Sequence, residues 1–271
     1  MRWGKNNRFW IKHFEGGYVF GDFVSGLNSY VFDKNESEYG KSELKKIKKK
    51  MKKAREDAFI EQNKIHENAA INAKNIWEKV HEVIGHPYLV KKKVQSYGLK
   101  EYKDCFLVPL FDSEGKLWSL QFITKDTKRF LSGGKKKGCY FVIGTISPSE
   151  NAFICEGYAT GATIHECSKI PVVVAFDAGN LKSVIQAIRE KYPQLKMTIC
   201  AYNDCYSQPN IVLEKAKEAV LISNAQVVVP QFKDASMNPT AYQQRIYFRR
   251  KFAIEAKIHE IHFSVQLLNE E

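Results

Sequence analysis

Residues 151–168 read NAFICEGYATGATIHECS, and this stretch decides the fold of the C-terminal half of the chain. An apolar run ends at Cys155, Glu156 and Gly157 follow, and a helix-like segment begins directly after them. The same alternation continues downstream, with strand-like PVVVAFD (171–177), MTICAY (197–202) and QVVVP (226–230) separated by helix-like NLKSVIQAIREKY (180–192) and NIVLEKAKEAVLIS (210–223). Near-continuous apolar strands between amphipathic helices are typical of a buried parallel sheet. We therefore expect an α/β fold here, and α+β over the whole chain.

Acidic residues follow each of these four predicted strands: Glu156, Asp177, Asp204 and Asp234. Ligands of parallel sheets bind at the carboxyl ends of the strands, so these side chains are predicted to share one rim. Carboxylates held close together repel one another, and a divalent cation such as Mg²⁺ neutralises them. Taken singly, Asp177 and Asp204 are also ordinary helix-cap or turn residues. Taken together, the four predict a metal site for phosphate chemistry.

The N-terminal half has a different pattern. Residues 1–40 are predicted to form a small β element with two or three antiparallel strands, because apolar and polar residues alternate between glycines up to residue 33. Residues 41–84 lack glycine and proline and carry an apolar stripe, which predicts one long basic helix. Residues 85–148 are predicted to form a mixed α/β subdomain, with a meander from 105 to 144 and a hairpin at 113–115. The sheet domain then spans 149–235, and a helical extension spans 236–271.

The charge of the chain favours a polyanionic partner. Lys and Arg number 42 against 30 Asp and Glu, a net charge of +12, which favours nucleic acid first and an anionic membrane surface second. Two lysine-rich regions could contact phosphates: KKIKKKMKKAR in the long helix, with Lys48, Lys49 and Lys52, and the turns of the meander, with Lys128, Arg129, Lys135, Lys136 and Lys137. A solvated helix face is the alternative interpretation of the first region.

Localisation is predicted from what the sequence lacks. The N-terminus has no apolar signal region, and no apolar run approaches the ~18 residues of a membrane span. The six cysteines are scattered without a CxxC pair, which indicates reduced thiols. We expect a cytoplasmic protein with no membrane partner.

Three stretches, FICEGYATGATIHE (153–166), VVVAFDAGNLKSVIQAIREKYP (172–193) and AYNDCYSQPNIVLEKAKEA (201–219), resemble the Toprim domain of phage and conjugative-plasmid DNA primases. The upstream HPYLVKKKV (86–94) and LFDSEGKLWSLQFITKDTKRFLSGG (110–134) resemble the segment that precedes Toprim in those proteins, and GGYVFGDFVSG (16–26) resembles their N-terminal element. The resemblance covers nearly the whole chain in the family's order.

This resemblance implies a primase-like enzyme that joins ribonucleoside triphosphates on single-stranded DNA, holds an RNA–DNA hybrid, and uses Mg²⁺ or Mn²⁺. The family glutamate corresponds to Glu156, and the second residue of its DxD pair corresponds to Asp204; Asp177 is a further metal candidate. The first residue of that pair corresponds to Tyr202, whose phenol is a poor ligand for Mg²⁺. The family's later acidic segment is only approximated by KDASMNPTAYQ (233–243).

Two other functions stay open beside the primase. One is a catalytically degenerate Toprim module that binds DNA or RNA, and the other is a Toprim nuclease. No zinc-binding module or helicase motor is evident in this chain, so start-site recognition and unwinding are expected from elsewhere, with a replicative helicase as a candidate partner.

Overall fold

The computed structural model describes residues 2–3, 9–22, 28–202, 211–231 and 240–254. The chain divides into two compact units. Unit 1 comprises Met1–Ile71 with Ser132–Gly134, and unit 2 comprises Asn72–Leu131 with Lys135–Glu271. Helix α1 (Lys41–Trp77) begins in unit 1, and its last residues belong to unit 2.

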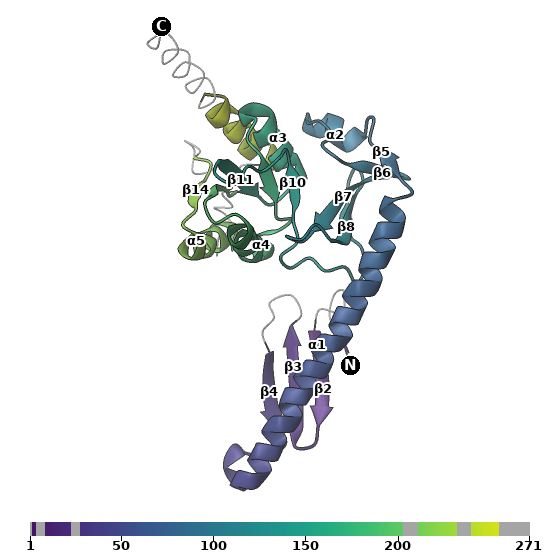
Figure 1. Cartoon of the computed structure of the whole chain (residues 1–271), viewed down its shortest axis with the longest axis vertical. Coiled ribbons are helices and arrows are strands. Elements are labelled where there is room, and N and C mark those ends of the chain that lie inside the picture. The colour runs from purple at the N-terminus through teal and green to yellow at the C-terminus, as the bar shows by residue number, and fades with distance from the viewer. Residues whose placement is uncertain (1, 4–8, 23–27, 203–210, 232–239, 255–271) are drawn as a thin grey trace. The chain divides into compact units, whose positions relative to one another are not determined.

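Unit 1 is an antiparallel sheet packed against α1 (Figure 1). Its strands run in the order β1 (Arg2–Trp3), β2 (Phe9–Phe14), β3 (Gly17–Asp22) and β4 (Asn28–Phe32), one strand more than the sequence predicts. A 3-10 turn, Glu36–Glu38, precedes the helix. Residues spaced three and four apart on α1 cover Trp10, Phe14 and Val19, and these are Ile47, Met51, Ala54 and Ala58. The predicted apolar stripe is therefore the face that packs on the sheet.

Helix α1 ends at Trp77, seven residues before the predicted end at residue 84. His81 and Glu82 form strand β5 and pair with β6 (Lys100–Tyr102), and this pairing takes the backbone out of the helix. The antiparallel sheet continues with β7 (Cys105–Phe111), β8 (Leu117–Ile123) and β9 (Lys128–Phe130). The short helix α2 (Pro87–Lys92) lies between β5 and β6 in sequence.

The second sheet of unit 2 has the order β10-β12-β11-β13-β14. Strands β11 (Asn151–Cys155), β12 (Val172–Val174), β13 (Lys196–Cys200) and β14 (Gln226–Val228) are parallel, as the sequence predicts. One assignment was wrong: β10 (Phe141–Ile143), predicted as part of the meander, pairs antiparallel with β12 at the edge of this sheet. A single bridge between Phe111 and Tyr140 links it to the meander.

Helices cover both faces of the parallel sheet (Figure 1). Helices α4 (Ala178–Lys191) and α5 (Ile211–Ser223) pack on the face that carries Ala152, Ile154 and Ile199. Helix α3 (Tyr158–Ser168) and a helix at residues 241–254 pack on the opposite face, where Phe248 and Phe252 join the core around Phe153. Alternate residues of each strand thus serve two cores.

Among the described residues, no helix is both long enough and apolar enough to cross a membrane.

Candidate functional site

A cavity of about 220 Å³ opens at the carboxyl ends of the parallel strands in unit 2. One wall is formed by residues at or after the carboxyl ends of β11, β12 and β13, and they are Glu156, Gly157, Ala159, Thr160, Phe176, Cys200 and Tyr202. The other wall comes from α2, β9 and the helix at 241–254, and it consists of Tyr88, Lys92, Lys128, Ala241 and Arg245. The carboxyl ends of the parallel strands, where the sequence predicts a binding site, therefore border a cavity.

Glu156 stands between strand β11 and helix α3. The buried strand ends at Cys155, and Gly157 caps α3 in an extended conformation with φ −119°. Glu156 is half-buried at the cavity wall, beside the first turn of α3. A carboxylate at the amino end of a helix interacts favourably with the helix dipole, so the fold suits an acidic side chain at this position.

Tyr202 closes the cavity next to Thr160. Its phenol oxygen lies 2.5 Å from the Thr160 hydroxyl and 3.5 Å from the carbonyl oxygen of Ala241. Its ring stacks at 6.3 Å on Phe248 in the core. Burial raises the pKa of Tyr202 to about 12, and the Thr160 hydrogen bond opposes only part of this shift. The phenol is therefore neutral at physiological pH and does not act as a second anion in the site.

Two lysines of the cavity share one aromatic ring. The ammonium groups of Lys92 and Lys128 each lie 5.6 Å from the centroid of the Tyr88 ring, where the negative π face stabilises a cation. Among the described residues, neither lysine forms an ion pair. Burial, followed by the charges of Arg245, Lys128 and Lys91, lowers the pKa of Lys92. The positive charges of these side chains are therefore close enough to repel one another.

Arg245 is the most deeply buried charge of the cavity, with only 4% of its surface exposed. Its Nη1 donates to the carbonyl oxygen of Lys92 at 2.8 Å and to the Thr163 hydroxyl at 3.4 Å. Its Nε is buried and has no hydrogen-bond partner in the described part of the chain. Arg245 thus fixes the helix at 241–254 to the end of α2 and presents a positive charge to the cavity.

Only one of the predicted metal ligands lines the cavity among the described residues. Glu156 lines the cavity. Asp177 does not line it: its carboxylate accepts from the Asn180 backbone N–H at 2.9 Å, capping α4, and it also pairs with Lys136. Asp204 and Asp234 lie outside the described residues. Within the described residues, no three His, Cys, Asp or Glu side chains are grouped so as to hold a metal ion.

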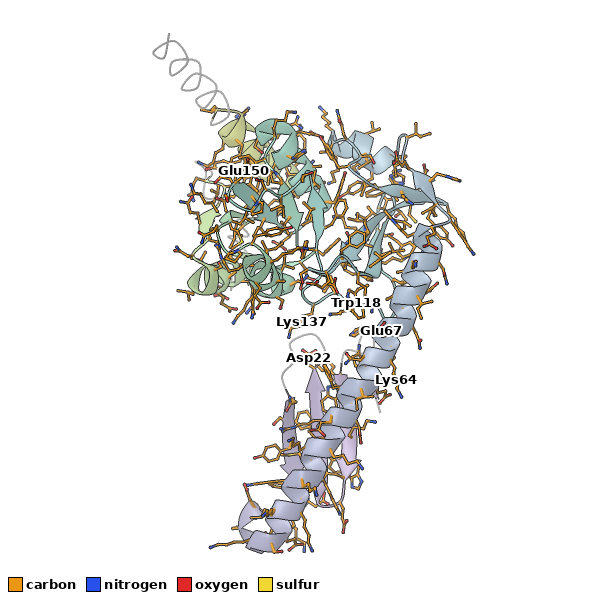
Figure 2. All side chains as sticks on the ribbon, in the orientation of Figure 1. Asp22, Lys64, Glu67, Trp118, Lys137 and Glu150 are labelled. Atoms are coloured by element: carbon orange, nitrogen blue, oxygen red, sulfur yellow. The ribbon has the colours of Figure 1, made fainter. Side chains whose placement is uncertain are left out.

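The predicted phosphate contacts on the meander are also spread out. Lys128 lines the cavity, whereas the Arg129 guanidinium lies 5.3 Å from the Phe122 ring centroid. Lys135 lies 4.4 Å from the Trp118 ring centroid, Lys136 pairs with Asp177, and Lys137 is exposed. Figure 2 shows Trp118 and Lys137 on the same side of unit 2.

On α1, the lysines are exposed, and carboxylates neutralise some of them. Lys48 pairs with Glu36 at 2.8 Å, and Lys52 lies 3.9 Å from Glu56. Lys49 is exposed and has no ion pair among the described residues. Of the three predicted lysines, Lys49 is therefore the most available to a phosphate.

Sequence reasoning missed several residues of the cavity: Tyr88, Lys92, Thr160 and Arg245. Tyr88 and Lys92 stand within HPYLVKKKV and Thr160 within EGYATGAT, so the quoted motifs contained three of them. Arg245 gave no signal, because it meets Lys92 across 153 positions of the chain.

Comparison with known proteins places this site in context. The chain is 30% identical over 192 residues to one DNA primase TraC of Escherichia coli and 28% identical over 254 residues to another. The chain is thus similar in sequence to two DNA primases. The matches cover 62% and 86% of this chain but only 18% and 17% of those primases, so it spans less than a fifth of their length.

Neither of the remaining comparisons adds to this relationship. No protein-family model matches the chain. A solved DnaG primase catalytic domain bound to ssDNA aligns with a TM-score of 0.46 and 12% identity, over 74% of this chain and 80% of that domain. The similarity to primases therefore rests on the two sequence matches.

Proposed function

We propose that this chain is the catalytic part of a DNA primase, which joins ribonucleotides on single-stranded DNA during plasmid or phage replication. The similarity to DNA primase TraC supports this reaction class. The observation that carries the proposal is the cavity itself, where Glu156 shares one space with Lys92, Lys128 and Arg245 at the carboxyl ends of parallel strands. Transfer of a nucleotidyl group requires positioning and charge neutralisation at phosphorus, and such a cavity provides both.

The cofactor we propose is Mg²⁺, or Mn²⁺ in its place. Glu156 would bind the ion from the cavity wall, and the oxygen ligands that Mg²⁺ prefers would be completed by water and by phosphate oxygens. We assign Asp204 as the second ligand. Asp177 is a weaker candidate because its carboxylate already caps α4 and pairs with Lys136. When bound, the ion would neutralise charge that develops on the transferred phosphate.

The partners we propose follow from the charges. Nucleoside triphosphates would enter the cavity beside Lys128. Single-stranded DNA, or the RNA–DNA hybrid formed on it, would contact Arg129, Lys135, Lys136 and Lys137 in unit 2, and Lys48, Lys49 and Lys52 in unit 1. The cytoplasm is the compartment we propose, and a replicative helicase is the protein partner.

The test is incorporation of labelled ribonucleotides on single-stranded DNA with Mg²⁺ and with Mn²⁺. Glu156→Gln removes the charge of the proposed metal ligand at constant size and is expected to abolish incorporation. Glu150→Gln is the matched control. Glu150 is exposed and precedes the amino end of β11, whereas Glu156 follows the carboxyl end of the same strand (Figure 2). Equal incorporation by Glu156→Gln and Glu150→Gln would contradict the proposal.

The neutral phenol of Tyr202 makes a second function testable in the same assay. If the native chain incorporates nothing and Tyr202→Asp gains incorporation, the native protein is a nucleic-acid-binding module with a silent site. If metal-dependent nicking of DNA replaces incorporation, the chain is a nuclease.

A further inference from the structure

Among the described residues that line the cavity, cations outnumber carboxylates. Among the described residues that line it, Lys92, Lys128 and Arg245 are cations, and Glu156 is the single carboxylate. Tyr202, the remaining acidic group that faces Glu156, is held neutral by burial. A cluster of three cations in a partly closed space is unfavourable unless an anion binds there.

Arg245 contributes a buried positive charge to this cluster. A guanidinium that is 4% exposed would ordinarily be fully hydrogen-bonded or ion-paired, because a buried charge without partners is costly. Arg245 has two hydrogen bonds from Nη1, to Lys92 and Thr163, and both acceptors are neutral. Its Nε has no hydrogen-bond partner among the described residues. Burial also lowers the pKa of Arg245, because removal from water penalises the charged form.

The size of the cavity selects the kind of anion. At about 220 Å³ it is smaller than the roughly 300–1,000 Å³ of pockets that enclose a drug-sized molecule. It therefore suits a chain of phosphate groups better than a whole nucleotide. Arginine and lysine are the side chains that bind phosphate, arginine through its fork of N–H groups and lysine as a point charge.

We infer that Arg245, Lys92 and Lys128 bind the polyphosphate of a nucleotide directly, without a metal ion between them and the phosphates. This inference rests on the proposed function for the identity of the nucleotide. It assigns a role to the helix at 241–254, which places Arg245 at the cavity by packing Phe248 and Phe252 into the core. These fixed charges provide neutralisation that a second metal ion would provide in a site with two carboxylates.

The experiment measures binding of inorganic tripolyphosphate to the whole chain by calorimetry, in the presence of EDTA. The native chain is expected to bind, and Arg245→Gln is expected to weaken binding by at least about tenfold, since one fixed charge is lost. Arg245→Lys keeps the charge but not the fork, so its affinity should lie between the two. Arg250→Gln, an exposed arginine on the same helix, is the control and should bind as the native chain does.

Two results would overturn the inference: no binding to the native chain until Mg²⁺ is added, or equal binding by Arg245→Gln and Arg250→Gln. Far-ultraviolet circular dichroism of each variant shows whether it folds, and Arg245→Lys tests the site if Arg245→Gln does not fold. Incorporation is measured separately. A chain that binds tripolyphosphate in EDTA but never polymerises retains the phosphate site and contradicts only the primase.

Discussion

The hydroxyl groups of Tyr202 and Thr160 lie 2.5 Å apart, and this hydrogen bond joins the end of β13 to the first turn of α3. It connects the two segments that follow the central strands of the sheet, immediately beside Glu156. The wall of the cavity is thus held by a neutral hydroxyl pair at the place where the resemblance to primases would put a carboxylate.

Removing either hydroxyl should destabilise the fold by the free energy of this hydrogen bond. Tyr202→Phe and Thr160→Val are each expected to lower the free energy of unfolding by about 1 kcal/mol. The double variant should lose less than the sum, because both changes remove the same bond. Urea denaturation of the four proteins measures the coupling energy. Additive losses would mean that the two hydroxyls act independently.

The buried phenols should lose their protons at a higher pH than exposed tyrosines do, and this should make the folded state unstable at alkaline pH. Burial raises the pKa of Tyr202 and of Tyr140 to about 12, above the ordinary value of 10. The unfolded chain therefore loses these protons first as the pH rises. Stability should be intact below pH 10 and fall between pH 10 and 12.

Near-ultraviolet absorbance of phenolate follows this titration directly. Of the thirteen tyrosines, those with raised pKa values should ionise only as the protein unfolds. Tyr202→Phe should remove one group that titrates near pH 12. If it instead removes a group that titrates near the ordinary value of 10, Tyr202 is not buried in solution.

A carboxylate at position 202 should attract metal. Tyr202→Asp places a second negative charge near Glu156, so Mn²⁺ should bind about tenfold more tightly, while tripolyphosphate in EDTA should bind less tightly. Tyr202→Asn is the control of similar size without charge. Calorimetric titration with Mn²⁺ and with tripolyphosphate measures both effects. Equal Mn²⁺ affinity in the Asp and Asn variants would show that Glu156 does not share its ion with position 202.

Gly161 should not tolerate a side chain. An added Cβ would lie 3.0 Å from Val174 Cγ2 and 3.2 Å from both Cys155 Sγ and Ile143 Cδ1, where α3 packs on the sheet. We expect Gly161→Ala to cost about 1 kcal/mol after the gain in helix propensity is subtracted. Gly179→Ala, exposed in the first turn of α4, would place its Cβ 3.3 Å from Asp177 Oδ1 and from no other atom within 4 Å, so it should cost less. Urea denaturation compares the two, and equal stability would show that α3 can shift away from the strands.

Binding of single-stranded DNA should depend on which lysine of α1 is changed. Lys49→Gln removes an exposed charge that has no ion pair among the described residues, so the salt dependence of log K should weaken by about 0.7 if Lys49 contacts a phosphate. Lys48→Gln should change this slope less, since Glu36 already neutralises Lys48. Fluorescence anisotropy at several salt concentrations measures both slopes. Identical slopes in the native chain and Lys49→Gln would exclude this contact.

The parallel sheet could be predicted because its signals are local. Each strand is a short apolar run, each helix repeats its apolar residues at helical spacing, and Glu156 follows directly from the end of its strand. Strand β10 was misassigned for the opposite reason. Nothing in YFVIG (140–144) tells whether it pairs with the meander before it or with β12, which follows it by about thirty residues.

Most of the basic wall of the cavity was beyond prediction from the sequence. Lys128 was among the predicted phosphate contacts, but Lys92 and Arg245 stand among many lysines and arginines, and only tertiary packing selects them. The burial of Arg245 depends on Phe248 and Phe252, which any amphipathic helix could carry. The predicted boundary at residue 235 treated this helix as an extension, whereas it packs in the core of unit 2.

The helix at 241–254 therefore sets the limits for any recombinant fragment of this protein. Cutting the chain after the last parallel strand would keep every residue of the sheet, yet it would uncover Phe153 and remove the only arginine that lines the cavity in the described part of the chain. A fragment of that kind could fail in solution and in assays for reasons unrelated to its carboxylates. Expression trials should extend past residue 254, so that an inactive product can be attributed to its chemistry.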